Sequence, residues 1–132
     1  MVPVLCNLLF CNKVAAESGR YNLEGIFYRI HALGYPCRHR CFVVAGWCGD
    51  SGSHSFTLKF LTPDRGRVVF ETPLHLFSLS VATPYFNSVV EVLLTFEQEG
   101  AHWFEIILNG HSGGFFPIHV ETLPHGALQR PV

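Results

Sequence analysis

Two runs of alternating apolar residues, separated by an Asn-Gly pair, constrain the fold of this chain more than any other feature. The runs lie at residues 103–108 and 115–120, on either side of Asn109-Gly110. Both residues of an Asn-Gly pair tolerate the positive φ angles of the tight turns that join antiparallel strands. Residues 103–120 are therefore predicted to form a β-hairpin with one buried face. The residues expected on that face are Phe104, Ile106, Leu108, Phe116, Ile118 and Val120.

A buried sheet face needs a second sheet to cover it, and the rest of the chain holds suitable strands. Apolar runs recur at spacings of about 8–12 residues with turn residues between them, which is typical of sandwiches and barrels. The only helical candidate, residues 14–18, is too short to stand alone. We expect an all-β, single-domain antiparallel β-sandwich of about nine strands over residues 1–121, followed by a surface tail at 122–132.

The first two predicted strands lie at residues 2–12 and 19–30. No basic residue precedes the apolar N-terminal run and Asn7 interrupts it, which favours a strand over a signal peptide. Gly25, inside the second strand, indicates a bulge or a close backbone approach. No apolar run reaches the ~18 residues of a membrane-spanning helix, so no membrane span is expected. The residues of the first strand predicted to point inward are Val4, Cys6, Leu8 and Phe10.

The charge and the cysteine content of the chain indicate which kinds of partner and which cellular compartment to expect. The net charge is −1 and only 14% of the residues are charged, so no basic surface exists to neutralise phosphates. We therefore expect no nucleic-acid partner. The five cysteines are an odd number in a chain without a convincing export signal, which favours reduced thiols and a cytoplasmic location.

Two motifs and a turn are similar to those of a known family. The motifs are Gly19-x-x-x-Leu23-x-Gly25-Ile26-Phe27 and Phe104-Glu105-Ile106-x-Leu108-Asn109-Gly110, the latter with Pro117 in the return strand. The turn is Pro63-Asp64-Arg65-Gly66. Together they resemble a domain-of-unknown-function family of short bacterial proteins, from which this chain departs by one inserted turn residue and by Asn109 in place of Asp. The resemblance implies a β-sandwich and carries no known activity or catalytic residues.

The segment Gly49-Asp50-Ser51-Gly52 matches the nucleophile loop of chymotrypsin-like serine proteases, and His54 lies close by. In that loop the serine backbone N–H helps to form the oxyanion hole. However, no aspartate precedes Asp50, and His54 is too near in sequence to act as that family's base. We interpret the segment as a Gly/Ser turn. Because no nucleophile–base pair or carboxylate pair fits its context, we expect no enzyme activity.

The alternating segment Cys37-Arg38-His39-Arg40-Cys41 is a candidate metal site. Structural zinc is commonly held by Cys-x-x-Cys pairs on tight turns, whereas Cys37 and Cys41 are four positions apart with no second matching pair. The two neighbouring arginines would oppose a cation. We therefore expect no metal or other cofactor and interpret the thiols as small buried hydrophobes. A Cys37–Cys41 disulfide is the alternative in an oxidising setting.

Histidines and aromatic residues at outward positions are the remaining surface features. Most of the eight histidines, including His75, His102 and His119, are expected on the solvated surface. A contiguous patch of exposed aromatic side chains would mark a binding surface. Such a patch is open to three interpretations, namely a face covered by a loop or the tail, a homodimer face, or a platform for a sugar or peptide. The aromatic residues predicted to point outward are Trp103, Phe115, Trp47, Tyr85 and Phe86.

These observations favour a non-catalytic module for protein interaction or assembly. It would act through a sheet face or an unpaired edge strand, with a protein or a second copy as its partner. Pro117 suits an edge position, because proline has no N–H to donate to a neighbouring strand. The alternative is a small-ligand module that binds carbohydrate or metal at the loops 35–39, 49–54 and 84–86.

Overall fold

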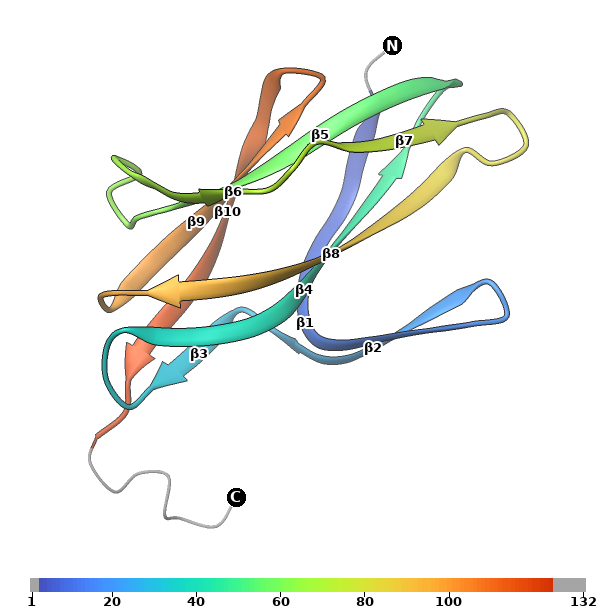
Figure 1. Cartoon of the computed structure of the whole chain (residues 1–132). Coiled ribbons are helices and arrows are strands. Elements are labelled where there is room, and N and C mark those ends of the chain that lie inside the picture. Colours follow the sequence, from blue (N-terminus) through green and yellow to red (C-terminus); the bar gives the residue numbers. More distant parts are fainter. Residues whose placement is uncertain (1–2, 125–132) are drawn as a thin grey trace.

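The computed structural model describes residues 3–124, which form ten β-strands and no helix (Figure 1). This part of the chain accordingly contains no helix long and apolar enough to cross a membrane. The strands are β1 (Val4–Glu17), β2 (Arg20–Phe27), β3 (Arg29–Ala32), β4 (Cys37–Cys48), β5 (Gly52–Leu61), β6 (Val68–Glu71), β7 (His75–Leu79), β8 (Tyr85–Phe96), β9 (Gly100–Leu108) and β10 (His111–Thr122).

The strands form two sheets that pack face to face. The four-stranded sheet has the order β2-β1-β4-β8, and the six-stranded sheet has the order β3-β10-β9-β5-β6, with β7 also pairing with β5. All pairs are antiparallel except β3 with β10. The predicted all-β sandwich is confirmed. The tenth strand arises because the run predicted as one strand at 19–30 is divided at Tyr28 into β2 and β3, which belong to different sheets.

The predicted hairpin is present as β9 and β10. Asn109 and Gly110 have φ angles of 49° and 83°, as a tight turn with two left-handed residues requires. Asn109 also joins the turn to β5, because its N–H donates to the Ser55 carbonyl at 2.8 Å and its Oδ1 accepts from the Ser55 N–H at 2.9 Å. Of the six residues predicted on the inner face, five are buried and Phe116 is half-buried.

Aromatic side chains fill the space between the two sheets. Phe60 of β5 contacts rings of both sheets, with its ring centroid 5.0 Å from that of Phe104 and 5.5 Å from that of Phe96 on the opposite sheet. This packing removes large apolar surfaces from water, which is the main favourable term in folding. The largest fully buried side chains include Trp47, Phe56, Phe60, Phe96, Phe104, Leu58, Leu94, Ile106 and Ile118.

The prediction for the inward face of the first strand was wrong at two of its four positions. Val4 is 59% exposed and Cys6 is also exposed, whereas Leu5 packs against the core. The reason is a β-bulge at Cys6: Leu5 pairs with Trp47, but Asn7 pairs with Gly46. An extra residue in one strand reverses the alternation of faces, so Leu8 and Phe10 point inward as predicted.

β1 is also longer than predicted and continues with β2 as an arm beyond the sandwich. It pairs with β4 only as far as Cys11, but with β2 from Phe10 to Glu17. Figure 1 shows this two-stranded arm projecting on the right, away from β4. The segment 14–18, considered above as a helical candidate, therefore belongs to the strand and its turn, which has positive φ angles at Ser18 and Gly19.

The end of the last strand, β10, is held by a hydrogen bond to β3. β10 ends at Thr122, and the Leu123 N–H donates to the Ala32 carbonyl at 2.8 Å. Most of the predicted tail, residues 125–132, lies outside the described residues.

Candidate functional site

Trp103 and Phe115 form one aromatic cluster on the outer face of the six-stranded sheet. They come from β9 and β10, and the Arg65 guanidinium carbon lies 4.2 Å from the centroid of each ring. The Trp103 Nε1–H donates to the Pro63 carbonyl at 3.3 Å. The turn between β5 and β6 therefore covers this pair, as in the first of the three interpretations. Phe115 remains 37% exposed, at the rim of the cluster.

Trp47 was wrongly predicted to point outward. Its side chain is 1% exposed, its ring stacks on that of Phe77 at 5.0 Å, and its Nε1–H donates to the Ser88 Oγ at 3.2 Å. β4 has a neighbour on each side, and both of its faces are apolar. The sequence therefore contained no alternation from which the inner face could be recognised.

Tyr85 and Phe86 both belong to β8 and lie apart from Trp103 and Phe115. Tyr85 is 70% exposed on the outer face of the four-stranded sheet. Phe86 is 40% exposed and lies at the rim of the inner face, with its ring stacked on that of Phe77 at 5.8 Å. The five aromatic residues predicted as one surface are thus divided among two outer faces and the core.

The free edges of the two sheets differ in how well they are protected against pairing with another chain. β3 and β6 have four residues each and β7 has five, while β2 contains the charged residues Arg20 and Glu24. Short length, charges and bulges all discourage edge-to-edge association. These strands therefore offer little to a partner strand.

The edge of β8 has almost none of these protections. β8 has twelve residues, and it pairs with β4 along its whole length without a register shift. Within residues 3–124, no strand pairs with its other edge. It contains no proline, and its only charged residue is Glu91, which the Arg40 guanidinium contacts at 2.9 Å. Sequence reasoning missed this edge because strand order cannot be obtained from a pattern of alternation.

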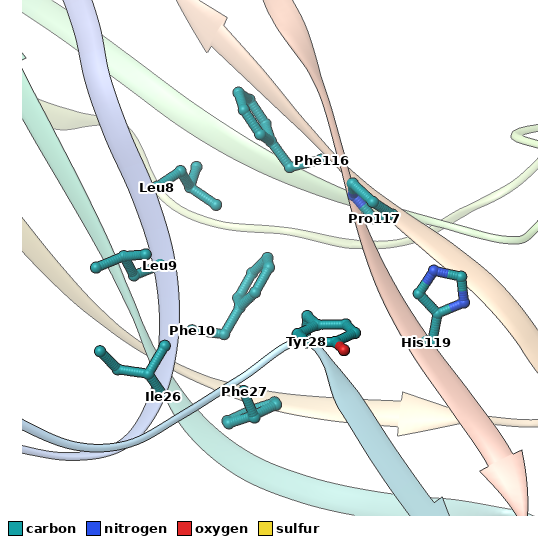
Figure 2. Close-up of a pocket in the computed structure, with 9 residues that line it drawn as sticks. All are labelled: Leu8, Leu9, Phe10, Ile26, Phe27, Tyr28, Phe116, Pro117 and His119. Atoms are coloured by element: carbon teal, nitrogen blue, oxygen red, sulfur yellow. The ribbon is translucent and has the colours of Figure 1, made fainter.

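An apolar groove of about 330 Å³ opens on the opposite side of the sandwich, between β1 and β10 (Figure 2). β2 pairs with β1 only from Phe10 onward, and β3 pairs with β10 only from His119 onward. The outer edges of β1 before Phe10 and of β10 before His119 therefore have no partner strand in the described residues. Pro117 pairs with Trp103 of β9 on one side and lies on the free outer edge of β10 on the other, in agreement with its predicted edge position. The groove is lined by Leu8, Leu9, Phe10, Ile26, Phe27, Tyr28, Phe116, Pro117 and His119.

The candidate metal ligands are spread along β4 and do not converge. Cys37, His39 and Cys41 share one face at intervals of two residues, which separates neighbours by about 6–7 Å. The His39 Nε2 lies 2.9 Å from the Asn12 Oδ1. Burial raises the pKa of the Cys41 thiol to about 12, with a smaller contribution from Cys11. The described part of the chain contains no group of three or more His, Cys, Asp or Glu side chains placed to hold a metal ion.

The alternative disulfide between Cys37 and Cys41 does not fit this geometry. Four steps along an extended strand separate the two α-carbons by about 13 Å, whereas a disulfide requires less than ~7 Å. Both residues belong to the same strand, β4, so no bend brings them together.

Ser51 and His54 also lie in different settings. Ser51 is exposed in the turn between β4 and β5. The His54 Nδ1 lies 3.1 Å from the Asn109 Nδ2, and its ring packs against Phe77. His54 therefore helps to join β5 to the turn of the hairpin.

His102 was wrongly predicted to lie on the surface. It is 2% exposed and stacks on Phe60 at 5.6 Å, on the same face of β9 as Phe104. Burial lowers the pKa of His102, and a hydrogen bond with the Gly100 carbonyl acts in the opposite direction. His75 and His119 are half-buried.

The loops suggested for a small ligand do not form one site. The loop 35–39 leads into β4 and the loop 49–54 follows it, so the two lie at opposite ends of a twelve-residue strand. Only the loops 49–54 and 84–86 are neighbours, with the Gly49 N–H donating to the Pro84 carbonyl at 3.2 Å.

The fold and its edges define the chain as a β-sandwich domain with one long unprotected edge strand. A family model described as "Family of unknown function (DUF6941)" matches residues 7–121, and the chain belongs to this family. The resemblance of its motifs to a domain-of-unknown-function family is thus confirmed. A search of curated proteins gave no match.

Solved structures show a likeness in fold. A crystal structure of beta-glucosidase from Listeria innocua in complex with glucose matches with a TM-score of 0.50 and 11% identity, over 86% of this chain and 16% of the enzyme. The same enzyme in complex with isofagomine matches with a TM-score of 0.46, again at 11% identity and with the same coverage. The chain therefore spans about a sixth of the length of the glucosidase, and at this identity the likeness extends to the fold alone.

Proposed function

We propose that this chain is a non-catalytic protein-interaction module of the bacterial cytoplasm, and that it assembles with a second copy of itself through the free edge of β8. The observation that carries the proposal is that β8 is long, regular and nearly uncharged at the edge of its sheet. Its unpaired N–H and C=O groups form a template for another strand. This edge accounts for two of the predicted surface aromatics, Tyr85 and Phe86.

A second copy suits this edge because antiparallel pairing across a two-fold axis joins the same surface of both chains. One unprotected edge per chain is then sufficient, and the assembly closes as a dimer. A register with Val90 on the axis places Glu91 opposite a Val89, so that the two carboxylates do not face each other directly. The exposed side chains of Tyr85 and Leu93, at 70% and 45%, would gain a partner surface.

The carbohydrate or metal alternative has less support. A ligand module requires a concave site with converging polar groups. The groove between β1 and β10 offers only the Tyr28 hydroxyl and the His119 ring as polar side-chain groups, and the suggested loops are separated along β4.

The test is the molar mass in solution, measured by analytical ultracentrifugation over a dilution series. We expect the wild-type chain to have the mass of two chains and to dissociate on dilution. Leu93→Lys introduces a charge on the β8 edge strand and should weaken the dimer by at least about tenfold, because edge lysines oppose strand pairing.

Leu76→Lys provides the matched control, because Leu76 is 76% exposed on β7 and lies outside the proposed interface. This variant should keep the mass of two chains. A wild-type chain that is monomeric at the highest concentration, or a Leu93→Lys variant that dimerises like the control, would show that the proposal is wrong. Far-UV circular dichroism of each variant checks that the sandwich is folded.

A further inference from the structure

The thiols of Cys6 and Cys48 lie in direct contact with each other. The two sulfur atoms lie 2.8 Å apart, with the Cys6 S–H donating to the Cys48 sulfur. The two residues are far apart in sequence and come from neighbouring strands, β1 and β4. No hydrogen bond joins the sulfur atoms of any other cysteine pair within residues 3–124, and Cys11 and Cys41 are fully buried.

The β-bulge of β1 brings these thiols together. Val4 pairs with Cys48 and Asn7 pairs with Gly46, so Cys6 is the extra residue between the two. Gly46 has no side chain, and the Asn7 amide occupies the space where a β-carbon would lie, at 2.9 Å. Cys6 is therefore directed towards Cys48 on the outer face of the four-stranded sheet. On that face Cys6 is exposed and Cys48 is half-buried.

We propose that Cys6 and Cys48 form a disulfide by thiol–disulfide exchange with a low-molecular-weight disulfide, and that this bond ties the N-terminal half of β1 to β4. The exposed Cys6 thiolate attacks one sulfur of the small disulfide, which releases one small thiol and leaves a mixed disulfide on Cys6. The Cys48 thiolate then attacks the Cys6 sulfur, the bond to the second small thiol breaks, and that thiol is released. The protein loses two protons and two electrons, and the small disulfide takes them up and is reduced to two thiols.

The position of the pair gives the bond a structural effect. β1 is unpaired on its outer edge from Val4 to Leu9, so β4 alone holds this segment in the sheet. A disulfide between residues 6 and 48 also closes a long loop and so restricts the unfolded chain. The hydrogen bond with Cys48 raises the pKa of the Cys6 thiol, and the exchange should accelerate as the pH rises through the alkaline range.

The test uses oxidised glutathione as the small disulfide, followed by intact-mass spectrometry and a count of free thiols in denaturant. Of the five thiols of the wild-type chain, two should be lost, with a mass decrease of two hydrogen atoms and no retained glutathione. A proteolytic fragment should link the two predicted cysteines, and dithiothreitol should restore all the thiols. Oxidation should raise the Tm by roughly 5–15 °C.

Three variants separate the proposed pair from other thiols. Cys48→Ser should retain one glutathione on Cys6, because no second thiol can displace it. Cys6→Ser should form no internal disulfide. Cys37→Ser, the matched control in the same strand as Cys48, should lose two thiols like the wild-type chain. If the wild-type chain keeps all its thiols free, retains glutathione on Cys6, or links a different pair, the proposal is wrong.

Discussion

At the scale of single residues, Gly25 determines how closely β2 approaches β1. Its φ angle is 67°, and a β-carbon at this position would lie 2.7 Å from the Asn12 Nδ2. The other amide atom of Asn12, Oδ1, lies 2.9 Å from the His39 Nε2. The glycine therefore makes room for a polar contact that joins β1 to β4 at the point where the two strands diverge.

We expect Gly25→Ala to lower the free energy of unfolding by about 2–4 kcal/mol, because it combines an unfavourable φ angle with a steric clash. Gly19→Ala is the matched control. Gly19 has a φ angle of 76° but no atom within 4 Å of the added carbon, so its cost should be only about 1 kcal/mol. Urea denaturation measures both values, and equal losses would contradict the steric role of Asn12.

His102 shows how a buried titratable side chain links stability to pH. Burial among Phe60 and Phe96 lowers its pKa, so the folded state favours the neutral ring more than the unfolded state does. Burial lowers the pKa of His39 in the same direction. The pKa of a histidine in the unfolded chain is about 6.5. As the pH falls below this value, the unfolded chain binds more protons than the folded chain, so the free energy of unfolding must decrease.

The free energy of unfolding should be nearly constant between about pH 7.5 and 8 and should fall below about pH 6.5, by up to ~1.4 kcal/mol per pH unit for each histidine. His102→Phe keeps a ring in the core, but this ring cannot be protonated. The free energy of unfolding of this variant should therefore change less with pH than that of the wild-type chain. His111→Phe, at an exposed position in β10, is the control and should keep the wild-type slope. Chemical denaturation at several pH values measures the slopes, and an unchanged slope in His102→Phe would contradict this account.

At the scale of elements, the arm formed by β1 and β2 is the part least supported by the core. Beyond Cys11, β1 pairs only with β2, and most arm residues are exposed. Val14 and Leu23, which face each other across the two strands, are only half-buried. An isolated two-stranded ribbon is marginally stable in water, so the arm should open without unfolding of the sandwich.

Hydrogen exchange measured by mass spectrometry tests this expectation. Amides of the arm, at residues 14–23, should exchange at least about a hundredfold faster than those of the central strands β5 and β9. The second half of β4, residues 42–48, pairs with both β1 and β8 and serves as the internal reference for a strand paired on both sides. Protection of the arm equal to that of β5 would mean that another surface covers it.

At the scale of the whole molecule, β4 connects the two proposed features. Cys48 pairs with Tyr85 at the start of β8, so the Cys6–Cys48 pair lies beside one end of the proposed interface. Leu93 pairs with Arg40 near the start of β4, whereas Cys48 is the last residue of that strand. Because residues this far apart contribute independently, Leu93→Lys should not alter the rise in Tm on oxidation when both chains are measured at a dilution where they are monomeric.

The sequence by itself determined the local features of this protein. Asn109-Gly110 specified the hairpin, because both the turn and the flanking alternation are properties of adjacent residues. Phe56, Leu58 and Phe60 were placed correctly for the same reason, since β5 is apolar on one face only. The close approach of the two backbones at Gly25 and the edge position of Pro117 could also be predicted, because both depend on the geometry of the residue itself.

Only the tertiary structure decided which residues meet across strands. Trp47 and His102 were placed on the wrong face because the face of a strand depends on which side its partner sheet covers. The bulge at Cys6 depends on Gly46, which is distant in sequence, so neither the exposure of Val4 nor the contact between Cys6 and Cys48 could be predicted. The free edge of β8 follows from strand order, which is set by packing of the whole core and not by any single segment.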